Sequence, residues 1–301
     1  MVMPVERICL LGFGEVGYTL AEDLLAKTSV ELRLWDKQLN LKNLADNPRI
    51  QIAESADSAA LDCQLVLSAV TANEAMAAAQ SVMPGISTLA WFVDLNSVSP
   101  ATKQQISDIV EQAGGRFVEA SIMSPIAPAG TASPILLSGG EASYFEATAK
   151  AIGFSGVEVV SSSLGRASAT KMCRSVIVKG MEALAIESLV AARHYGVEDA
   201  VLASLNNLFP RDDWPQFARY LISRSLQHGT RRAAEMREAA KTVTETGLDP
   251  LMSEACAKRQ DWAAQYKTLL REQALNELLD SMGVSMDHSN QIHRIPKSNT
   301  L

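Results

Sequence analysis

The sequence lacks the long apolar runs and leader features that would direct it into a membrane or out of the cell. No apolar run approaches the roughly 18 residues that indicate a membrane span. The N-terminal stretch MVMPVERICLLG has no basic region and no adequate apolar core, so we expect no signal peptide. These absences predict a cytoplasmic protein with no membrane partner.

Cysteine and histidine are too few and too scattered to indicate a disulfide framework or a metal centre. The four cysteines form no CxxC pair and are typical of buried thiols in a reducing compartment. The four histidines have no cysteine or carboxylate partner at the spacing of a zinc site, so we expect no metal. The residues concerned are Cys9, Cys63, Cys173 and Cys256, and His194, His228, His288 and His293.

Positive charge is also scarce. The chain has 27 Lys+Arg against 34 Asp+Glu, a net charge of −7, and no basic block, which argues against a nucleic-acid partner. Its 47% hydrophobic and 20% charged residues are typical of a globular protein with substantial cores. A length of 301 residues suffices for two domains of ordinary size.

The first half of the chain alternates short apolar runs with helical patterns. Strands are predicted at 6–11, 30–35, 50–53, 64–70, 89–95, 116–120, 134–138 and 157–161. Helices are predicted between them at 15–27, 73–83, 100–113 and 141–152. This alternation predicts an α/β fold with a Rossmann-type, doubly wound, mostly parallel sheet.

After Ser163 the pattern becomes all-helical. Residues 166–195 contain no proline and one interior glycine, which predicts a single long interdomain helix. Shorter helices are predicted at 198–208, 214–226, 228–246 and 250–281, with Gly247 and Gly283 at helix ends. We therefore expect a dinucleotide-binding domain over 1–163, an all-helical substrate and dimerisation domain over 164–285, and a loose polar tail over 286–301.

A GxGxxG motif lies between the first predicted strand and the first predicted helix. It consists of Gly12, Phe13, Gly14, Glu15, Val16 and Gly17. Gly12 permits a tight turn, Gly14 lets a pyrophosphate approach the backbone, and Gly17 lets the helix pack against the strand. With Asp36 about 20 residues further on, after the second strand, the motif predicts a dinucleotide site.

Other residues refine the cofactor prediction. Asp36 would accept hydrogen bonds from ribose hydroxyls and repel a 2′-phosphate, which favours NAD; the adjacent Lys37 leaves NADP open. Val70, Thr71 and Asn96 follow two further strands, at the sheet edge where dinucleotides bind. For Thr71 the alternative is a helix N-cap.

Residues 165–181 are basic in an otherwise acidic chain. They contain Arg166, Lys171, Arg174 and Lys179 and no acidic residue. We interpret the stretch as a place kept positive for an anionic substrate, with Lys171 available for proton transfer. The alternative is a helix whose cations are solvated or paired with acids from elsewhere.

Four segments, in this order, resemble the β-hydroxyacid dehydrogenases, a superfamily that includes 6-phosphogluconate dehydrogenase. They are GFGEVG (12–17), DLNSVSP (94–100), EASIMSP (119–125) and GRASATK (165–171). The resemblance covers roughly residues 5–195. It implies an NAD(P)-dependent oxidoreductase that transfers a hydride to or from a small 3-hydroxy acid or its oxo or semialdehyde form. It also implies that Lys171 is the catalytic general acid/base, and that the chain forms a homodimer or larger assembly.

The chain departs from this family where the substrate would bind. Ser124 and Pro125 replace paired glycines, and Ser175 replaces an asparagine. The expected substrate-binding residues are Ser121, Met123, Ser124, Ser175, Lys179, Arg231 and Arg232. Arg231 and Arg232 form a candidate fork for a carboxylate or phosphate, although a surface salt bridge from Arg231 to Glu235 is the alternative.

These departures keep two other functions open. One is a sensor that binds NAD(H) with little or no turnover, and the other is a reductase of a different carbonyl substrate. Lys171 argues against an imine substrate, because imine-reducing relatives use an acid at the corresponding position.

Overall fold

The computed structural model describes residues 4–38, 44 and 46–292, with the backbone alone for 286–292. It divides into two compact units. The first, here called the sheet unit, comprises Met1–Arg174 and Glu238–Asp249, and the second, the helical unit, comprises Ser175–Arg237 and Pro250–Leu301. Within the described ranges, no helix combines the length and the apolar character that a membrane crossing needs.

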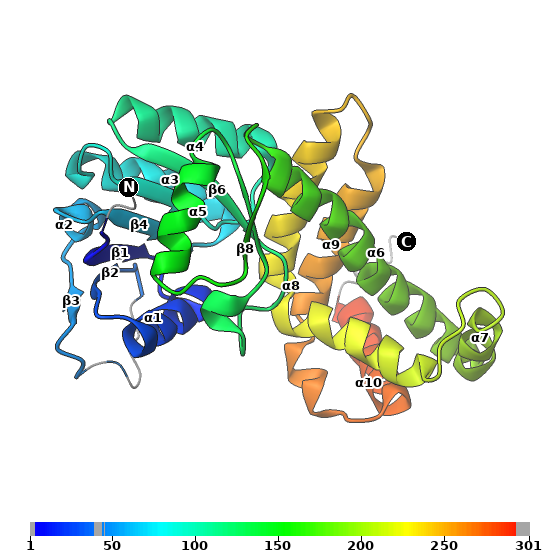
Figure 1. Cartoon of the computed structure of the whole chain (residues 1–301). Coiled ribbons are helices and arrows are strands. Elements are labelled where there is room, and N and C mark those ends of the chain that lie inside the picture. The colour runs from blue at the N-terminus through cyan, green and yellow to red at the C-terminus, as the bar shows by residue number, and fades with distance from the viewer. Residues whose placement is uncertain (1–3, 39–43, 45, 293–301) are drawn as a thin grey trace, which may run out of the picture. The chain divides into compact units, whose positions relative to one another are not determined.

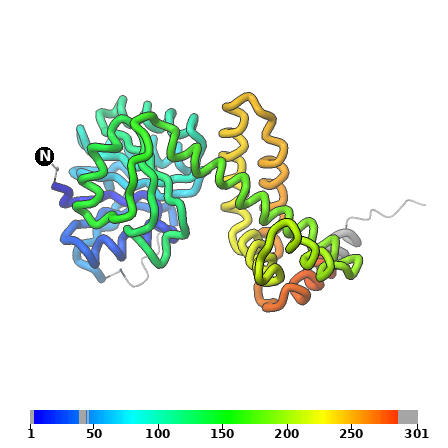
Figure 2. Tube along the Cα trace, turned by 45° about the vertical axis from the view of Figure 1, so that its right-hand side comes forward, coloured from blue at the N-terminus to red at the C-terminus, as the bar shows by residue number. Residues whose placement is uncertain are grey.

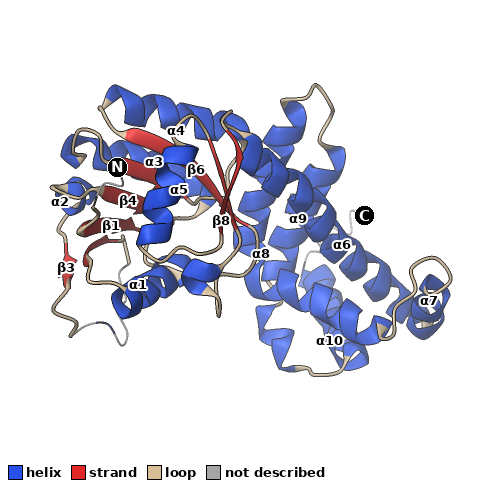
Figure 3. Ribbon diagram, in the orientation of Figure 1, coloured by secondary structure: helices blue, strands red, loops and turns tan. Residues whose placement is uncertain are grey.

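An eight-stranded sheet forms the centre of the sheet unit, in the order β3-β2-β1-β4-β5-β6-β7-β8 (Figures 1 and 3). Its strands are β1 Arg7–Leu11, β2 Glu31–Trp35, β3 Ile50–Ile52, β4 Leu65–Ser68, β5 Trp91–Asp94, β6 Arg116–Ile122, β7 Ile135–Ser138 and β8 Val157–Ser161. Neighbouring strands are parallel except β6 and β7, which are antiparallel. The predicted Rossmann-type sheet is confirmed.

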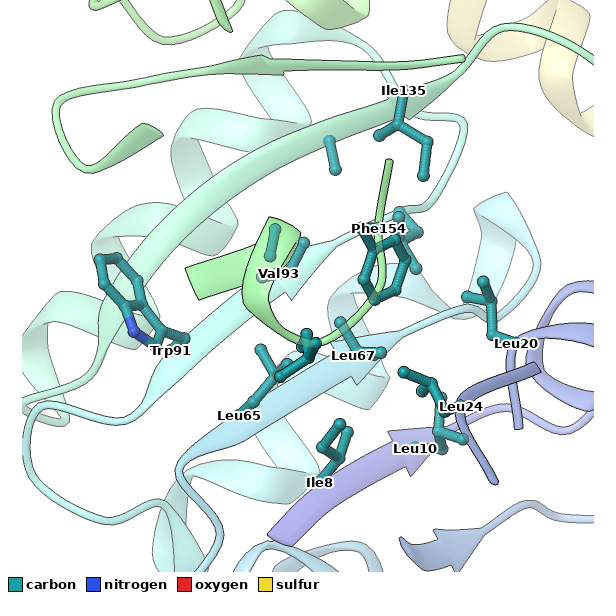
Figure 4. Packing of buried hydrophobic residues seen from close by; sticks show 14 of the residues in the cluster. Ile8, Leu10, Leu20, Leu24, Leu65, Leu67, Trp91, Val93, Ile135 and Phe154 are labelled. Atoms are coloured by element: carbon teal, nitrogen blue, oxygen red, sulfur yellow. The ribbon is translucent and has the colours of Figure 1, made fainter. Parts of the chain in front are cut away.

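Helices cover both faces of the sheet (Figure 3). They are α1 Glu15–Lys27 and α5 Ala142–Ala151 on one face, and α2 Ala56–Ala60, α3 Ala75–Val82 and α4 Pro100–Gln112 on the other. Alternate residues of β1 serve the two cores: Ile8 and Leu10 join the first, and Cys9 and Leu11 join the second. Figure 4 shows the first core, with Leu24 of α1 lying against Leu10.

The strand order reverses between β1 and β4. Both strands run in the same direction, and their last residues, Leu11 and Ser68, are partners in the register. In open α/β sheets ligands bind beyond the carboxyl ends of the strands at such a reversal. The loops that follow Leu11 and Ser68 are therefore the expected place for a ligand.

The helical unit contains most of the long helices. They are α6 Arg166–Tyr195, which begins in the sheet unit, α7 Glu198–Leu205, α8 Trp214–Thr244, which ends in the sheet unit, α9 Leu251–Ala264 and α10 Leu275–Ile292, with a 3-10 helix η5 at Lys267–Arg271. The long helix over 166–195 is confirmed at both ends. The core of the helical unit includes Ile186 and Leu189 of α6, Ile222 of α8, and Leu278 and Met282 of α10.

Two helix predictions are wrong. The break predicted near 227 is absent, because α8 passes through Gly229, where a Cβ would lie 2.4 Å from the Gln260 carbonyl oxygen. This glycine permits close approach of α8 and α9. The single helix predicted over 250–281 is instead α9, η5 and α10, and α10 continues past Gly283 to Ile292. Gly247, with φ +83°, does follow the end of α8. Residues 293–301 of the predicted tail lie outside the described residues.

Candidate active site

The loop between β1 and α1 has the geometry that admits a ligand against its backbone. Gly12 has φ +87°, and a Cβ there would lie 2.5 Å from the Ala69 carbonyl oxygen. A Cβ at Gly17 would lie 2.0 Å from the Gly12 carbonyl oxygen, so both positions require glycine. Gly14 is exposed, and no heavy atom from another described part of the chain lies within 4 Å of a Cβ placed there. The backbone at Gly14 is therefore open to the close approach of a ligand.

The start of α1 offers backbone donors to such a group. Gly14 is the N-cap residue and has no side chain to accept hydrogen bonds from the first-turn amides. Unpaired amides and the helix dipole together attract an anion. Glu15, the acid in this turn, is exposed, and Val16 packs against the first core.

Asp36 lies beside this loop, just beyond the end of β2. One of its carboxylate oxygens accepts a hydrogen bond from the Phe13 amide at 2.6 Å, and the other accepts one from the Gln38 amide at 2.6 Å. The Phe13 ring is buried, edge-on to Tyr18, so Phe13 presents its backbone rather than its side chain to the loop. The structure therefore brings the glycine motif and Asp36 together.

Asn96 joins the two loops that were predicted to contact a cofactor. It is buried, its Oδ1 accepts a hydrogen bond from the Val70 amide at 2.8 Å, and its Nδ2 donates to Ser68 Oγ at 2.9 Å. Thr71 is exposed and is the N-cap residue of a short 3-10 helix, η2 Ala72–Glu74, but its hydroxyl makes no capping hydrogen bond. The N-cap alternative therefore does not account for the Thr71 hydroxyl.

A buried ion pair supports the same edge of the sheet. Lys103 of α4 and Asp94 of β5 are fully buried, with Lys103 Nζ 3.1 Å from Asp94 Oδ2. The ammonium also donates to the Asp94 carbonyl oxygen at 2.7 Å, and Asp94 Oδ1 accepts from the Asn96 amide at 3.0 Å. Sequence reasoning missed this pair. The available signal was the spacing of Lys103, Ile106 and Val110, which places the lysine on the apolar face of α4.

Glu119 of β6 anchors the first turn of α6. Its fully buried carboxylate accepts hydrogen bonds from the Gly165 amide at 2.6 Å, from Ser138 Oγ at 2.6 Å, and from the Ser168 amide. Ser138 Oγ in turn accepts from the Ala167 amide at 3.1 Å. A carboxylate satisfies the unpaired amides there and is stabilised by the positive end of the helix. Sequence reasoning assigned Glu119 no role.

The proposed catalytic lysine and three of the predicted substrate-binding residues also belong to the sheet unit. Lys171 is half-buried on α6, one turn beyond the segment that Glu119 holds. Ser121 is buried, and within the described chain its Oγ has no hydrogen-bond partner. The Met123 amide donates to the Pro134 carbonyl oxygen at 2.9 Å, and Ser124 Oγ donates to the Pro125 carbonyl oxygen at 3.0 Å.

The loop after β6 is tied to α1 through Asp23. Asp23 Oδ2 accepts hydrogen bonds from the Thr131 amide at 2.7 Å, from Thr131 Oγ1 at 2.6 Å and from Lys27 Nζ at 2.7 Å. Burial acts to raise the pKa of Asp23, but the hydrogen bonds from Lys27 and Thr131 outweigh it and hold the pKa below its ordinary value. A Cβ at Gly130 would lie 2.4 Å from Asp23 Oδ2, so this close contact requires glycine.

The three cations of the helical unit that were predicted to bind substrate, Lys179, Arg231 and Arg232, are paired with acids. Lys179 Nζ is buried, lies 2.8 Å from Glu235 Oε2 and donates to Ser175 Oγ at 3.0 Å. For Lys179 the structure therefore shows the alternative, a cation paired with an acid that is distant in the sequence, on α8. Arg231 lies 3.4 Å from the same Glu235, which is the surface salt bridge considered as the alternative.

Arg232 also has a partner. It is buried, and its Nη1 lies 2.8 Å from Glu182 Oε2, to which Gln260 Nε2 donates at 3.2 Å. Burial raises the pKa of Glu182 and lowers the pKa of Arg232, and their mutual attraction opposes both shifts. Arg232 is thus part of the helical core rather than an open fork for a substrate carboxylate.

Metal ligands do not gather in the described residues, where no three His, Cys, Asp or Glu residues are placed to hold an ion. The donor set at the β1–α1 loop consists of amides and a carboxylate, which fits a phosphate and a ribose.

Comparisons with known proteins match both halves of the chain. Residues 7–163 match the NAD binding domain of 6-phosphogluconate dehydrogenase, and residues 192–263 match a domain of unknown function, DUF1932. A conserved hypothetical protein from Sinorhizobium meliloti 1021 is 32% identical, with a TM-score of 0.70 over 92% of this chain and 97% of that one.

Two further structures are similar. A conserved protein of unknown function, described as structurally similar to 3-hydroxyacid dehydrogenases, is 31% identical, with a TM-score of 0.65 over 87% of this chain and 98% of that one. A 3-hydroxyisobutyrate dehydrogenase of Mycobacterium tuberculosis is 14% identical, with a TM-score of 0.69 over 93% and 99% of the two chains, and shares the fold.

Proposed function

The chain belongs to the family of the NAD binding domain of 6-phosphogluconate dehydrogenase, and on that premise we propose that it is an NAD(P)-dependent oxidoreductase. Its substrate is proposed to be a small 3-hydroxy acid or the corresponding oxo or semialdehyde form. The observation that carries the proposal is the glycine loop, where Gly12 and Gly17 leave no room for a side chain while Gly14 faces open space. Family membership confirms the resemblance drawn from the sequence.

NAD(H) is the proposed cofactor. Two amides already bond to Asp36, and a carboxylate has about four acceptor positions, so two remain for the ribose hydroxyls. The same negative charge would repel a 2′-phosphate. Lys37, which left NADP open, pairs with Glu74, and this supports NAD(H). The pair is exposed and therefore weak, so NADP(H) binding is the competing outcome of a titration.

Lys171 is proposed as the general acid/base. The nicotinamide supplies or accepts the hydride when it is bound. Lys171 would take the hydroxyl proton of the substrate during oxidation and return it during reduction. The hydrogen bonds from the α6 amides to Glu119 hold the helix turn that precedes Lys171, which supports a fixed position for its ammonium group.

We still propose an anionic substrate, but not the substrate-binding residues Lys179 and Arg232 that the sequence suggested. Lys179 and Arg232 already have carboxylate partners, so using either for a substrate would leave Glu235 or Glu182 uncompensated. We assign the substrate instead to Lys171, the exposed Arg174, and Ser121, whose buried hydroxyl has no partner within the described chain. Met123 and Ser124 lie just after the end of β6, the strand that contains Ser121.

The experiment is a turnover assay. The full chain is mixed with NAD⁺ and a panel of 3-hydroxy acids, or with NADH and their oxo forms, and absorbance of the reduced nicotinamide is followed. The proposal predicts turnover for at least one acid and weaker turnover for its neutral alcohol or aldehyde analogue. Equal rates for neutral and acidic analogues would contradict the anionic substrate.

A second candidate is a sensor that binds NAD(H) without turnover. It is favoured by Ser175, which stands where the resembled family has an asparagine and whose hydroxyl accepts a hydrogen bond from Lys179. Tight NADH binding with no turnover across the panel would select this candidate.

A further inference from the structure

Helix α6 has two apolar faces where a surface helix normally has one. Ile186 and Leu189 are buried in the core of the helical unit. A second set of large apolar side chains is exposed, with exposed fractions of 66% for Ile177, 41% for Met181, 58% for Leu184 and 77% for Tyr195. A helix that is apolar on both sides is expected to be covered on both sides. Within the described chain the second face is uncovered.

The exposed residues follow a regular spacing. Steps of four and three residues connect Ile177, Met181, Leu184, Ser188, Ala191 and Tyr195, here called the outer seam. Alternating steps of four and three are the pattern of a helix that packs lengthwise against another helix. In Figures 1 and 2, α6 runs across the front of the helical unit, over α9. Two residues of α9, Cys256 and Gln260, donate hydrogen bonds to α6.

The outer seam fits a second copy of itself. If two seams run antiparallel about a two-fold axis at Leu184, each Ile177 faces the partner's Ala191, and Met181 lies near the partner's Ser188. Large side chains then meet small ones, as interlocking helix packing requires. Leu184 meets its own symmetry mate, as in any interface with a two-fold axis.

Charge favours the same partner. The chain carries a net charge of −7, so two copies repel each other unless the meeting surface is neutral. The outer seam has no charged residue. Among the charges beside it, Glu187 pairs with Arg259, and Arg193 pairs with Asp280 and Glu198. Association along the seam would therefore bury neither Glu187 nor Arg193 without its partner.

The seam alone is too small for a stable dimer. From Ile177 to Tyr195 the seam is roughly 27 Å long. A helix face about 10 Å wide then supplies about a third of the roughly 800 Å² that each partner buries in a standard interface. A groove of about 470 Å³ extends the surface along the second half of the seam, with Val190, Trp262 and Leu279 among its lining residues. Antiparallel pairing directs the partner's Met181 towards this groove, and a flexible methionine suits an irregular gap.

We propose that the outer seam of α6 and the adjoining groove form the two-fold interface of a homodimer. The proposal does not depend on the cofactor or on turnover. It defines a surface for the homodimer that the family resemblance leads us to expect.

The first test compares two Leu→Glu variants of the full chain by sedimentation velocity. Leu184→Glu places two carboxylates against each other at the axis. We expect the wild type to be a dimer at micromolar concentration and the dissociation constant of Leu184→Glu to rise by at least 100-fold. Leu208→Glu, at a position that is 75% exposed and outside the seam, should dimerise as the wild type does. A monomeric wild type, or a dimeric Leu184→Glu, would overturn the proposal.

A second test does not require the interface to be disrupted. In a Cys173→Ser background, which removes the exposed native thiol, Leu184→Cys and Leu208→Cys are oxidised and run on a non-reducing gel. Because Leu184 lies on the proposed axis, Leu184→Cys should become a covalent dimer, while Leu208→Cys should stay largely monomeric. Equal cross-linking of both variants, or none of Leu184→Cys, would contradict the antiparallel arrangement.

Discussion

The sheet unit and the helical unit both bury charged side chains, but the buried charges contact different things. In the sheet unit, Glu119 and the Asp94–Lys103 pair hold backbone groups next to the carboxyl edge of the sheet, where the glycine loop lies. In the helical unit, Glu182–Arg232 and Lys179–Glu235 join one helix to another. The first group positions a site, and the second group holds a bundle together. Mutations in the two groups should therefore change different measurements.

The largest effect is expected at Lys171. Lys171→Ala should lower kcat by about 10² to 10⁴, the range for loss of a positioned general acid/base, while the affinity for NAD(H) changes little. Steady-state kinetics with the best acid of the panel measures this. Thr170→Ala is the matched control, because its exposed hydroxyl bonds only to a carbonyl oxygen of its own helix. A kcat for Lys171→Ala within a few-fold of the wild-type value would make the lysine structural.

Two substitutions test the comparison itself. Glu119→Gln should lower kcat by on the order of tenfold with little change in KM, because the α6 turn before Lys171 loses its anchor. Arg232→Gln should leave kcat almost unchanged but lower the free energy of unfolding by about 3 kcal/mol, because the buried Glu182 carboxylate loses its counter-charge. Kinetics and urea unfolding distinguish them. If both variants lost kcat equally, the division of roles between the units would be wrong.

Asp36 should have a smaller effect, confined to the cofactor. Asp36→Ala should weaken NAD(H) binding roughly tenfold, because about one hydrogen bond to a charged group is lost. It should also reduce the difference in affinity between NAD(H) and NADP(H). Fluorescence titration of both cofactors measures it. A wild type that prefers NADP(H) would reverse the assignment and give Lys37 the role of binding a 2′-phosphate.

The smallest effect is expected in the pH dependence of stability, which should have opposite signs in the two units. The pKa of Asp23 is held low, so its stabilising contribution is complete above the unfolded value near 3.9 and is lost as the pH falls through the folded pKa. The pKa of Glu182 is raised, so its unfavourable contribution at neutral pH is relieved on acidification through that raised pKa. Hydrogen exchange at several pH values should show the sheet unit weakening first. Asp23→Asn should remove this contribution to the pH dependence of stability in the sheet unit, and Glu182→Gln should remove the one in the helical unit.

Local signals in the sequence predict most of the fold and part of the site. The GxGxxG motif and Asp36 lie together as expected, since strand–loop–helix spacing fixes both, and α6 has its predicted ends because no proline or cap interrupts it. Long-range contacts decide the rest. Gly229 lies within α8 because α9 passes close to it, and Lys179 is neutralised by Glu235 from another helix. A pattern read along the chain contains neither contact.

The most direct test of the account is calorimetric titration of NAD⁺ and NADH into the wild type and Gly14→Val. The backbone at Gly14 has φ −72°, which any residue adopts, and its surroundings leave room for a side chain, so the variant should fold and unfold as the wild type does. The added methyl groups would occupy the space assigned to the pyrophosphate. The account predicts that the wild type binds and that Gly14→Val loses at least tenfold in affinity. A wild type that binds neither cofactor, or a Gly14→Val that binds equally well, would contradict it.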